Sequence, residues 1–284
     1  MLYLILNILA AVIDALLFKI SEIKNGNKFL VLFVNYVVAF SVSLYLWYIG
    51  GGVTPTKITL SFGLINGFLF IITFVIFMNS ISFNGVGLSV SIMRLAVVMP
   101  IILSIILFAE IPSIKRGSGI VLALIALYFF GMAIRENEKS KSKERGRNSL
   151  KGVLFAVLLF LFMGSGEFVL KLFDEFSGGN QKEVFFLIIF GTALLINVFL
   201  LGRDKKREFR DILIGFFIGV FNYMNLYFFV LALSKLPAVV VFAATDVSVV
   251  SLTIIAGRLF FKEKISAKGY LGLLFAITSL FLIR

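Results

Sequence analysis

The sequence contains no cysteine and no histidine. Without thiols it forms neither disulfides nor thiolate nucleophiles. Without imidazole it lacks the commonest general base and the usual ligands of zinc and haem. These two absences remove several classes of enzyme and metalloprotein at the outset.

Known catalytic motifs are also missing. The sequence has no His-Glu-x-x-His or Gly-x-Ser-x-Gly motif, no Walker loop and no carboxylate cluster for two metal ions. The segment GSGE at Gly164–Glu167 has a serine but no base within reach in the sequence. We therefore predict a protein that is not an enzyme and needs neither cofactor nor metal.

Apolar residues, in contrast, are in excess. Hydrophobic residues make up 60% of the 284 residues, and 34 residues are phenylalanines. Soluble chains average about 45–50% apolar residues, so we predict a polytopic membrane protein. The N-terminal MLYLILNILAAVID has no basic region and no small-residue cleavage site, which predicts a first membrane span and not a cleaved signal peptide.

The net charge of +12 resides mainly in short segments between apolar runs. Basic residues in such places act as topology signals and contact lipid headgroups. We therefore expect membrane lipids, and no nucleic acid, among the partners.

Ten apolar runs approach the ~20 residues that span the hydrocarbon core of a bilayer. They predict an all-α integral membrane fold with ten transmembrane helices. The runs are Leu2–Phe18, Phe29–Ile49, Leu60–Ile81, Val86–Ala109, Gly117–Ile134, Leu150–Leu170, Val184–Leu201, Ile212–Leu233, Ala238–Phe261 and Lys268–Ile283.

The fourth and fifth runs repeat in the ninth and tenth at an offset of 153 residues. Self-similarity at a fixed spacing indicates an internal repeat. The identical pairs are Phe108/Phe261, Glu110/Glu263, Ser113/Ser266, Lys115/Lys268, Gly119/Gly272, Ala123/Ala276 and Leu127/Leu280. Glycine pairs in the third and eighth runs also match, at an offset of 152, as Gly63/Gly215 and Gly67/Gly219.

The polar segment RENEKSKSKERGRN, residues 135–148, separates the two copies. We expect it to be a solvated linker between a first repeat at 1–134 and a second at 149–284. Because each copy has five spans, an odd number, the copies would cross the membrane in opposite directions. This arrangement is an inverted repeat, a common plan of secondary transporters.

With this organisation the chain resembles the drug/metabolite transporter superfamily, in particular its ten-helix EamA-like members. The resemblance covers nearly the whole length. It depends on the repeat, on the passage ALSKLPAVVV, on Pro100 deep in the fourth run, and on the hairpins AEIPSIKRGSGI and KEKISAKGYLGL. The family usually has Gly-Glu in these hairpins, whereas this chain has Ala109-Glu110 and Lys262-Glu263.

The orientation in the membrane has two opposed indications. Of the 27 Lys and Arg residues, 19 lie on the side of the segment 135–148 and seven on the side of both termini. The positive-inside rule therefore puts the linker in the cytoplasm and both termini outside. The resemblance implies that both termini are in the cytoplasm.

Arg94 and Asp246 are the charged residues deepest in the spans, and they occupy positions one residue apart in the two repeats. A charge at the bilayer centre costs roughly 2.5–3.5 kcal/mol on insertion scales, so it needs a partner or a function. One interpretation is a buried ion pair that links the two halves. The other is a substrate site in which Arg94 binds a carboxylate or phosphate and Asp246 an ammonium.

Asp14 and Glu167 are a second matched pair, in the first and sixth runs. A carboxyl group in a low dielectric exchanges its proton near neutral pH, which makes both residues candidates for proton coupling. In the alternative interpretation Lys19 and Lys171 form ion pairs with them near the membrane surface.

The eighth run carries a polar stripe that includes Asn222 and Asn225, with Tyr223 beside it. The resemblance implies a central cavity lined by the first, third, fourth, sixth, eighth and ninth helices. On that basis Asn222, Asn225, Tyr223 and, in the third run, Asn66 become candidate substrate contacts. Hydrogen bonds between side-chain amides of neighbouring helices explain the asparagines equally well.

We predict a secondary transporter in the plasma membrane that exports a small polar metabolite by alternating access, either uncoupled or coupled to protons. An amino acid, a related zwitterion or an organic anion fits a site made of Arg94 and Asp246. A lipid-headgroup flippase and a non-transporting membrane scaffold are the alternatives. We expect a monomer or a weak homodimer.

Overall fold

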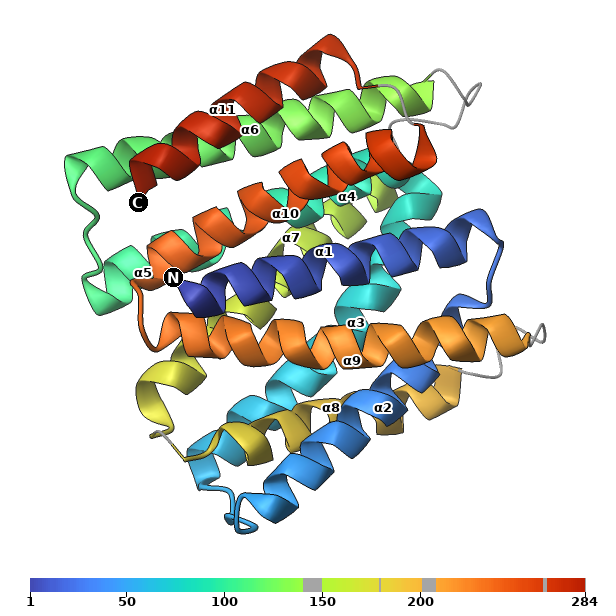
Figure 1. Ribbon diagram of the computed structural model, residues 1–284, viewed down its shortest axis with the longest axis vertical. Coiled ribbons are helices and arrows are strands. Elements are labelled where there is room, and N and C mark those ends of the chain that lie inside the picture. Colours follow the sequence, from blue (N-terminus) through green and yellow to red (C-terminus); the bar gives the residue numbers. More distant parts are fainter. Residues whose placement is uncertain (140–149, 179, 201–207, 263–264, 284) are drawn as a thin grey trace. The chain divides into compact units, whose positions relative to one another are not determined.

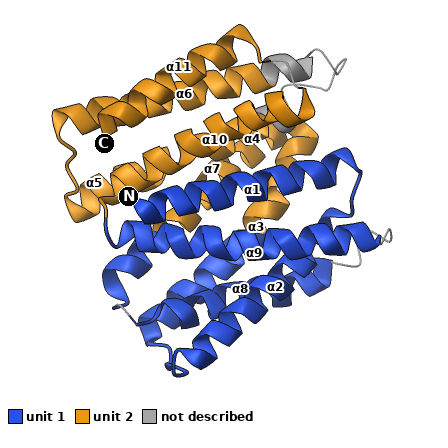
Figure 2. Cartoon of the chain, viewed as in Figure 1, with its two compact units in different colours: residues 1–71, 169–235 blue, residues 72–168, 236–284 orange. Residues whose placement is uncertain are grey.

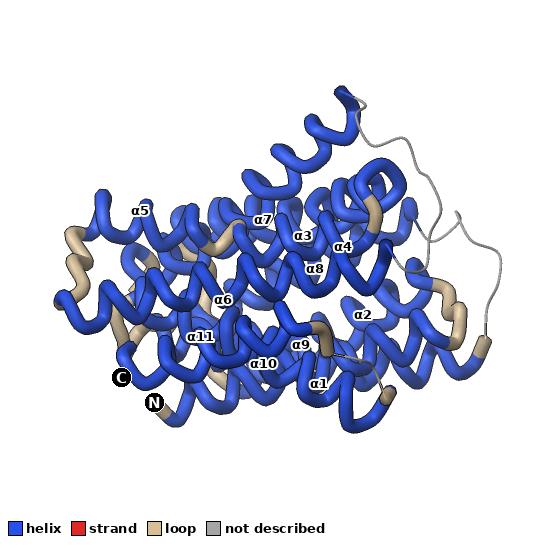
Figure 3. Tube along the Cα trace, turned by 90° about the horizontal axis from the view of Figure 1, so that it is seen from above, coloured by secondary structure: helices blue, strands red, loops and turns tan. Residues whose placement is uncertain are grey.

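The computed structural model describes residues 1–139, 150–178, 180–200, 208–262 and 265–283. Every regular element in this part of the chain is a helix (Figures 1 and 3). The helices are α1 (Leu2–Ile23), α2 (Lys28–Ile49), α3 (Lys57–Asn84), α4 (Val86–Leu95), α5 (Val98–Phe108), α6 (Ile114–Lys139), α7 (Leu150–Phe176), α8 (Lys182–Leu200), α9 (Phe209–Leu233), α10 (Ala238–Phe261) and α11 (Ala267–Ile283).

The predicted all-helical membrane fold is confirmed. Within the described residues, nine helical segments are long and apolar enough to cross a membrane, with α4 and α5 counted as one segment. The last predicted span is the short helix α11, which has 17 residues. The protein is therefore a multi-pass membrane protein.

The fourth predicted span is present as the segment Leu88–Phe108, but its helix contains a turn. It is interrupted at Ala96 and Val97, which separate α4 from α5. The cause is Pro100, whose nitrogen carries no hydrogen and cannot donate to the carbonyl of Ala96 four residues earlier. The N–H of Met99 donates to that carbonyl instead, at 3.0 Å, and this tighter turn breaks the regular helix.

The predicted linker at 135–148 begins inside a helix, because α6 continues to Lys139. Residues 140–148 lie outside the described residues. The division of the chain into two repeats at this linker stays a prediction.

By contacts, the chain forms two compact units, and each contains helices from both halves of the sequence (Figure 2). Unit 1 consists of residues 1–71 and 169–235, and in it α9 packs against both α1 and α2. Unit 2 consists of residues 72–168 and 236–284, and in it α6 packs against α4, α10 and α11. Helices α3 and α7 contribute one part to each unit.

In unit 1 the matched glycine pairs make matched contacts. A Cβ atom at Gly219 of α9 would lie 2.7 Å from the carbonyl oxygen of Asn35 in α2. A Cβ atom at Gly67 of α3 would lie 2.6 Å from the carbonyl oxygen of Ile189 in α8. The absent side chains let α9 approach α2, and α3 approach α8, in the same way.

A second glycine pair does the same in unit 2, between α6 and α11. Gly119 of α6 lies against Ile283 of α11, and Gly272 of α11 lies against Phe130 of α6. The offset of 153 residues converts the first contact into the second. The two helices therefore pack antiparallel, with the first turns of α6 beside the last turn of α11.

The hairpin after α5 has a left-handed residue and a capping glutamate. Ala109 and Lys262, which match at the same offset, both have positive φ, at 52° and 55°. These are the positions where the resembled family has glycine, the residue that adopts this conformation without steric cost. Glu110 then accepts a hydrogen bond from the backbone N–H of Val239 at 3.2 Å, so it caps the start of α10 and has a structural role.

Candidate functional site

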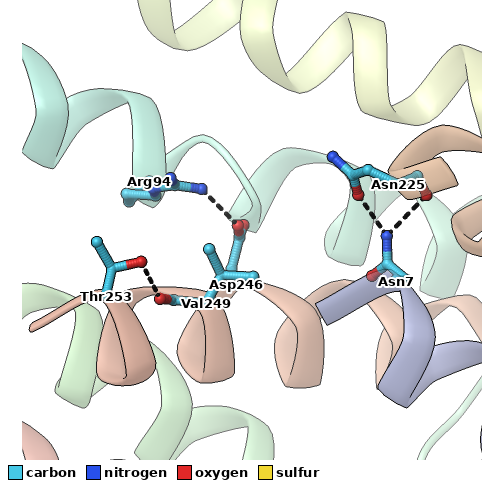
Figure 4. Close-up of polar contacts among 6 residues, drawn as sticks. All are labelled: Asn7, Arg94, Asn225, Asp246, Val249 and Thr253. Carbon is cyan, nitrogen blue, oxygen red and sulfur yellow. Dashed lines mark hydrogen bonds and ion pairs between the residues drawn. The ribbon is translucent and has the colours of Figure 1, made fainter. Parts of the chain in front are cut away.

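Unit 2 contains an ion pair between Arg94 and Asp246 (Figure 4). The Nη1 atom of Arg94 donates to Oδ1 of Asp246 at 3.3 Å. The Asp246 side chain is 9% exposed, whereas that of Arg94 is 26% exposed. The guanidinium has five N–H donors in a planar fork, and this contact engages one of its nitrogens. Arg94 therefore keeps donors for a further anionic group.

The break between α4 and α5 positions Arg94. The residue lies in the last turn of α4, where the helix dipole presents its negative end and favours a cation. Ala96 and Val97 keep helical backbone angles, so the turn is a kink within the membrane span Leu88–Phe108, and Arg94 lies directly before this kink.

α10 presents Asp246 from an unbroken helix. At the position that corresponds to Pro100 in the repeat, α10 has Thr253. The Thr253 hydroxyl donates to the carbonyl of Val249 at 2.6 Å, so it bonds within a continuous helix (Figure 4). α10 is buried along most of its length, including Asp246, so the carboxylate is held in a packed environment.

Glu167 of α7 lies near this pair. It interacts electrostatically with both Arg94 and Asp246. One of its carboxylate oxygens, Oε2, is buried and has no hydrogen-bond partner among the described residues. Gly164, one turn earlier, explains the approach, because its missing side chain lets α7 contact Ala96 and Met99 at the break between α4 and α5.

These three side chains do not balance in charge. One guanidinium faces two carboxyl groups, which leaves one negative charge in excess if both are ionised. An uncompensated buried charge is strongly destabilising. The cluster can therefore hold one proton or one positively charged ligand group.

A small cavity of about 110 Å³ adjoins Arg94 within unit 2. Side chains of α4, α6 and α10 line it, and apart from Arg94, Ser91 and Thr253 they are apolar or glycine. The other lining residues are Val90, Leu127, Phe130, Gly131, Ile134, Val250 and Ile254.

The asparagines predicted as substrate contacts lie in unit 1, where their side-chain amides form hydrogen bonds between helices. The Nδ2 atom of Asn222 donates to Oδ1 of Asn35 in α2 at 3.1 Å. The Nδ2 atom of Asn7 in α1 donates to the backbone oxygen of Asn225 at 2.9 Å and to its Oδ1 at 2.6 Å (Figure 4). The polar stripe of α9 thus joins α1 and α2, and a substrate role for Asn222 and Asn225 stays a prediction.

The other two predicted substrate contacts are also in unit 1. Tyr223 packs among aromatic rings, with ring centroids 5.7 Å from Phe186 and 5.9 Å from Tyr227. Its hydroxyl is buried and has no hydrogen-bond partner in the described part of the chain. Asn66 of α3 is fully buried. Neither residue lies on the cavity beside Arg94.

Asp14 and Glu167, the predicted proton-coupling residues, have different surroundings. Asp14 has a buried oxygen, Oδ1, without a hydrogen-bond partner in the described ranges, and it interacts electrostatically with Tyr36 of α2. Glu167 belongs to the cluster with Arg94 in unit 2. The Nζ atom of Lys171, the alternative partner of Glu167, donates to Oε2 of Glu175 at 2.8 Å, and a pairing of Lys171 with Glu167 stays a prediction.

Four buried polar residues were not among the predicted site residues. Asn7 and Asn35 complete the amide bonds, and Asn197 of α8 is fully buried with neither amide atom hydrogen-bonded in the described part of the chain. The carboxylate of Asp211 accepts the N–H of Asn27 at 3.0 Å and so fixes the turn before α2. The signal for the asparagines is an amide inside an apolar run, where every polar group needs a partner.

Metal binding finds no support in the described residues, where no group of three or more Asp or Glu side chains could hold an ion. What the site offers is a guanidinium with free donors, two nearby carboxyl groups and an apolar cavity. This arrangement can bind and neutralise a small charged molecule, and it contains no nucleophile paired with a base.

Residues 150–284 match the EamA-like transporter family. An uncharacterized protein of Haemophilus influenzae (strain ATCC 51907 / DSM 11121 / KW20 / Rd) is 26% identical over 291 residues, which cover 98% of this chain and 96% of that protein. A solved structure, described only as the crystal structure of a protein, is similar with a TM-score of 0.78 at 10% identity. The similarity covers 99% of this chain and 97% of that one, and it shows the fold alone.

Proposed function

We propose that the protein is a secondary transporter of a small polar metabolite, namely an amino acid, a related zwitterion or an organic anion. Its residues 150–284 match the EamA-like transporter family, which supports a membrane transporter of the drug/metabolite type. The observation that carries the proposal is the ion pair of Arg94 and Asp246 beside a cavity. In this proposal the substrate carboxylate binds the free donors of Arg94, and its ammonium, where it has one, binds Asp246. The direction is export from the cell.

We also propose that the two halves are an inverted repeat that works by alternating access about this site. The support comes from the matched glycine contacts, in which α9 approaches α2 as α3 approaches α8. The kink between α4 and α5 adds support, because it lies beside Arg94 within a membrane span and a kinked helix can bend when the two halves move.

Proton coupling is the second part of the proposal, with Asp14 and Glu167 as the coupling residues. The excess negative charge of the cluster in unit 2 supports Glu167 in this role. Asp14 has a buried oxygen without a hydrogen-bond partner among the described residues. This oxygen supports Asp14 as a second proton-coupling residue, within unit 1. We also propose that four polar residues of unit 1 contact the substrate during part of the cycle. They are Asn222, Asn225, Tyr223 and Asn66.

The proposed setting is the plasma membrane, with the protein as a monomer or a weak homodimer. A lipid-headgroup flippase would use the same fold with a lateral opening. A scaffold would need Arg94 and Asp246 only as a structural pair, so an exchange of the two residues would preserve its function.

Transport into proteoliposomes tests the site. We expect Arg94→Gln to reduce uptake of radiolabelled amino acids to the level of empty liposomes, because the carboxylate loses its partner. Arg258→Gln, the same change at an exposed arginine of α10, should keep full uptake.

Glu167→Gln should remove the stimulation of uptake by a pH gradient.

A variant with Arg94→Gln alone leaves Asp246 buried without its partner, which typically costs about 3–5 kcal/mol. The double variant Arg94→Gln/Asp246→Asn removes both charges and so keeps the protein folded, as size-exclusion chromatography would verify. Unchanged uptake by this folded double variant would contradict the proposed site.

A further inference from the structure

The cavity beside Arg94 has one charged end and an otherwise mostly apolar lining. Of its lining residues, only Arg94 carries a charge, and its polar groups apart from that are the hydroxyls of Ser91 and Thr253. The Thr253 hydroxyl is already bonded to the carbonyl of Val249 at 2.6 Å. A ligand in the cavity therefore finds a cation at one point and hydrocarbon over most of the remaining wall.

The second charge that a zwitterion needs lies next to the cavity. Asp246 precedes Val250 by four residues and Thr253 by seven, and this spacing places all three on one face of α10. Val250, Thr253 and Ile254 line the cavity, whereas Asp246 lies one turn before it and holds Arg94. The guanidinium that lines the cavity is thus paired with a carboxylate that lies just outside the lining.

The cavity volume limits what the apolar part can accept. At about 110 Å³ it is somewhat smaller than the ~150 Å³ apolar cavity that accommodates benzene. A group of about three or four carbon atoms fills this partly open space, and a large aromatic side chain would extend out of it. Gly131 lets α6 approach Ser91 closely at this wall, because a Cβ atom there would lie 2.7 Å from the Ser91 hydroxyl oxygen.

We infer that this cavity is a side-chain subsite and that the substrate is an α-amino acid with a short branched aliphatic side chain. This inference rests on the proposed function, since it takes Arg94 as the carboxylate partner and Asp246 as the ammonium partner. The apolar wall formed by Leu127, Phe130 and Val250 then selects the side chain. Polar side chains bind less well because hydrocarbon makes up most of the wall and few groups there replace their hydrogen bonds to water.

Binding to the purified protein, measured by scintillation proximity with leucine as radioligand, tests the inference. Each buried methylene is expected to strengthen binding by about fourfold, so affinity should rise from alanine to valine and leucine. Serine, lysine and phenylalanine should compete weakly. Isovalerate, which lacks the ammonium, and isoamylamine, which lacks the carboxylate, should each compete at least tenfold more weakly than leucine.

The decisive variant is Val250→Ala, which enlarges the cavity. It should weaken valine binding several-fold and improve phenylalanine binding relative to leucine. Val249→Ala is the matched control, because Val249 is the neighbouring buried valine of α10 and does not line the cavity. If Val250→Ala does not fold, Ile254→Val removes a single methylene from the wall and should give a smaller shift in the same direction.

Equal shifts in the Val249 and Val250 variants, or an affinity that does not depend on side-chain length, would overturn the subsite. Competition by isovalerate as strong as that of leucine would identify an aliphatic carboxylate and overturn the amino acid. Failure of the proposed function has a different result, because in that case the double variant Arg94→Gln/Asp246→Asn would still transport.

Discussion

At the scale of single residues, this membrane protein tolerates polar groups where another polar group meets them. Arg94 meets Asp246, Asn7 meets Asn225, and Asn222 meets Asn35. Each pair joins residues far apart in the sequence, so each also ties two helices together. Oε2 of Glu167 departs from this pattern, as do Oδ1 of Asp14 and the side-chain amide of Asn197. Among these residues Glu167 interacts electrostatically with Arg94 and Asp246, which is why it is a functional residue in our proposal.

Ala109 offers a prediction at the same scale. With φ at 52°, its Cβ atom makes the left-handed conformation unfavourable by roughly 1–2 kcal/mol. Ala109→Gly removes this cost and adds some entropy to the unfolded chain. The net result should be a stabilisation of about 0.5–1 kcal/mol, measured as a higher thermal unfolding midpoint in detergent.

The same change inside a helix should have the opposite sign, which makes it a strict control. Ala156 lies within α7, and Ala156→Gly should destabilise by about 0.5–1 kcal/mol. A lower midpoint for Ala109→Gly would mean that the alanine side chain makes stabilising contacts that outweigh its backbone strain.

At the scale of helices, glycines determine which pairs pack closely. At Gly215, Gly219, Gly67 and Gly272 the nearest obstacles to a side chain include backbone oxygens of the neighbouring helix. A backbone atom cannot rotate away as a side chain can. These contacts therefore resist substitution more than contacts between two side chains.

We expect Gly219→Ala to destabilise the protein by about 1–3 kcal/mol, because the new Cβ atom would lie 2.7 Å from the oxygen of Asn35 and push α9 from α2. Gly117→Ala is the matched control, since its nearest neighbour is Pro112 at 3.8 Å. It should be neutral or slightly stabilising. Thermal unfolding of both variants measures the difference, and equal midpoints would refute the packing argument.

The sequence predicts most of this architecture because hydropathy and the repeat are strong signals. All ten apolar runs correspond to helices, and the fourth differs only by its interruption after Leu95. Pro100 signals a disturbance, but the tertiary contact of Gly164 with the break depends on packing that no pattern encodes. For the same reason the sequence indicates Arg94 and Asp246, and it indicates neither the cavity beside them nor the pairing of Asn222 with Asn35.

At the scale of the whole molecule, the sequence and the family resemblance disagree about direction across the membrane. The charge bias, with 19 of 27 basic residues on the linker side, is the stronger physical argument, because it acts through insertion energetics of this chain. We therefore predict a cytoplasmic linker and external termini.

Because the chain has no cysteine, single-cysteine variants need no prior background removal. We expect an impermeant maleimide to label Thr54→Cys, in the exposed loop between α2 and α3, in intact cells. Ser142→Cys, in the segment 135–148, should be labelled only after permeabilisation. The reverse pattern would support the orientation implied by the resemblance.

The short helix α11 has a consequence for the lipid around the protein. Its 17 residues extend about 25 Å, whereas the hydrocarbon core of a typical bilayer is about 30 Å thick. This difference is a hydrophobic mismatch, and the lipid beside α11 accommodates it by local thinning. Its packing partner α6 has 26 residues, so the mismatch concerns α11 alone, and the thinning is confined to the lipid on that side of the helix pair.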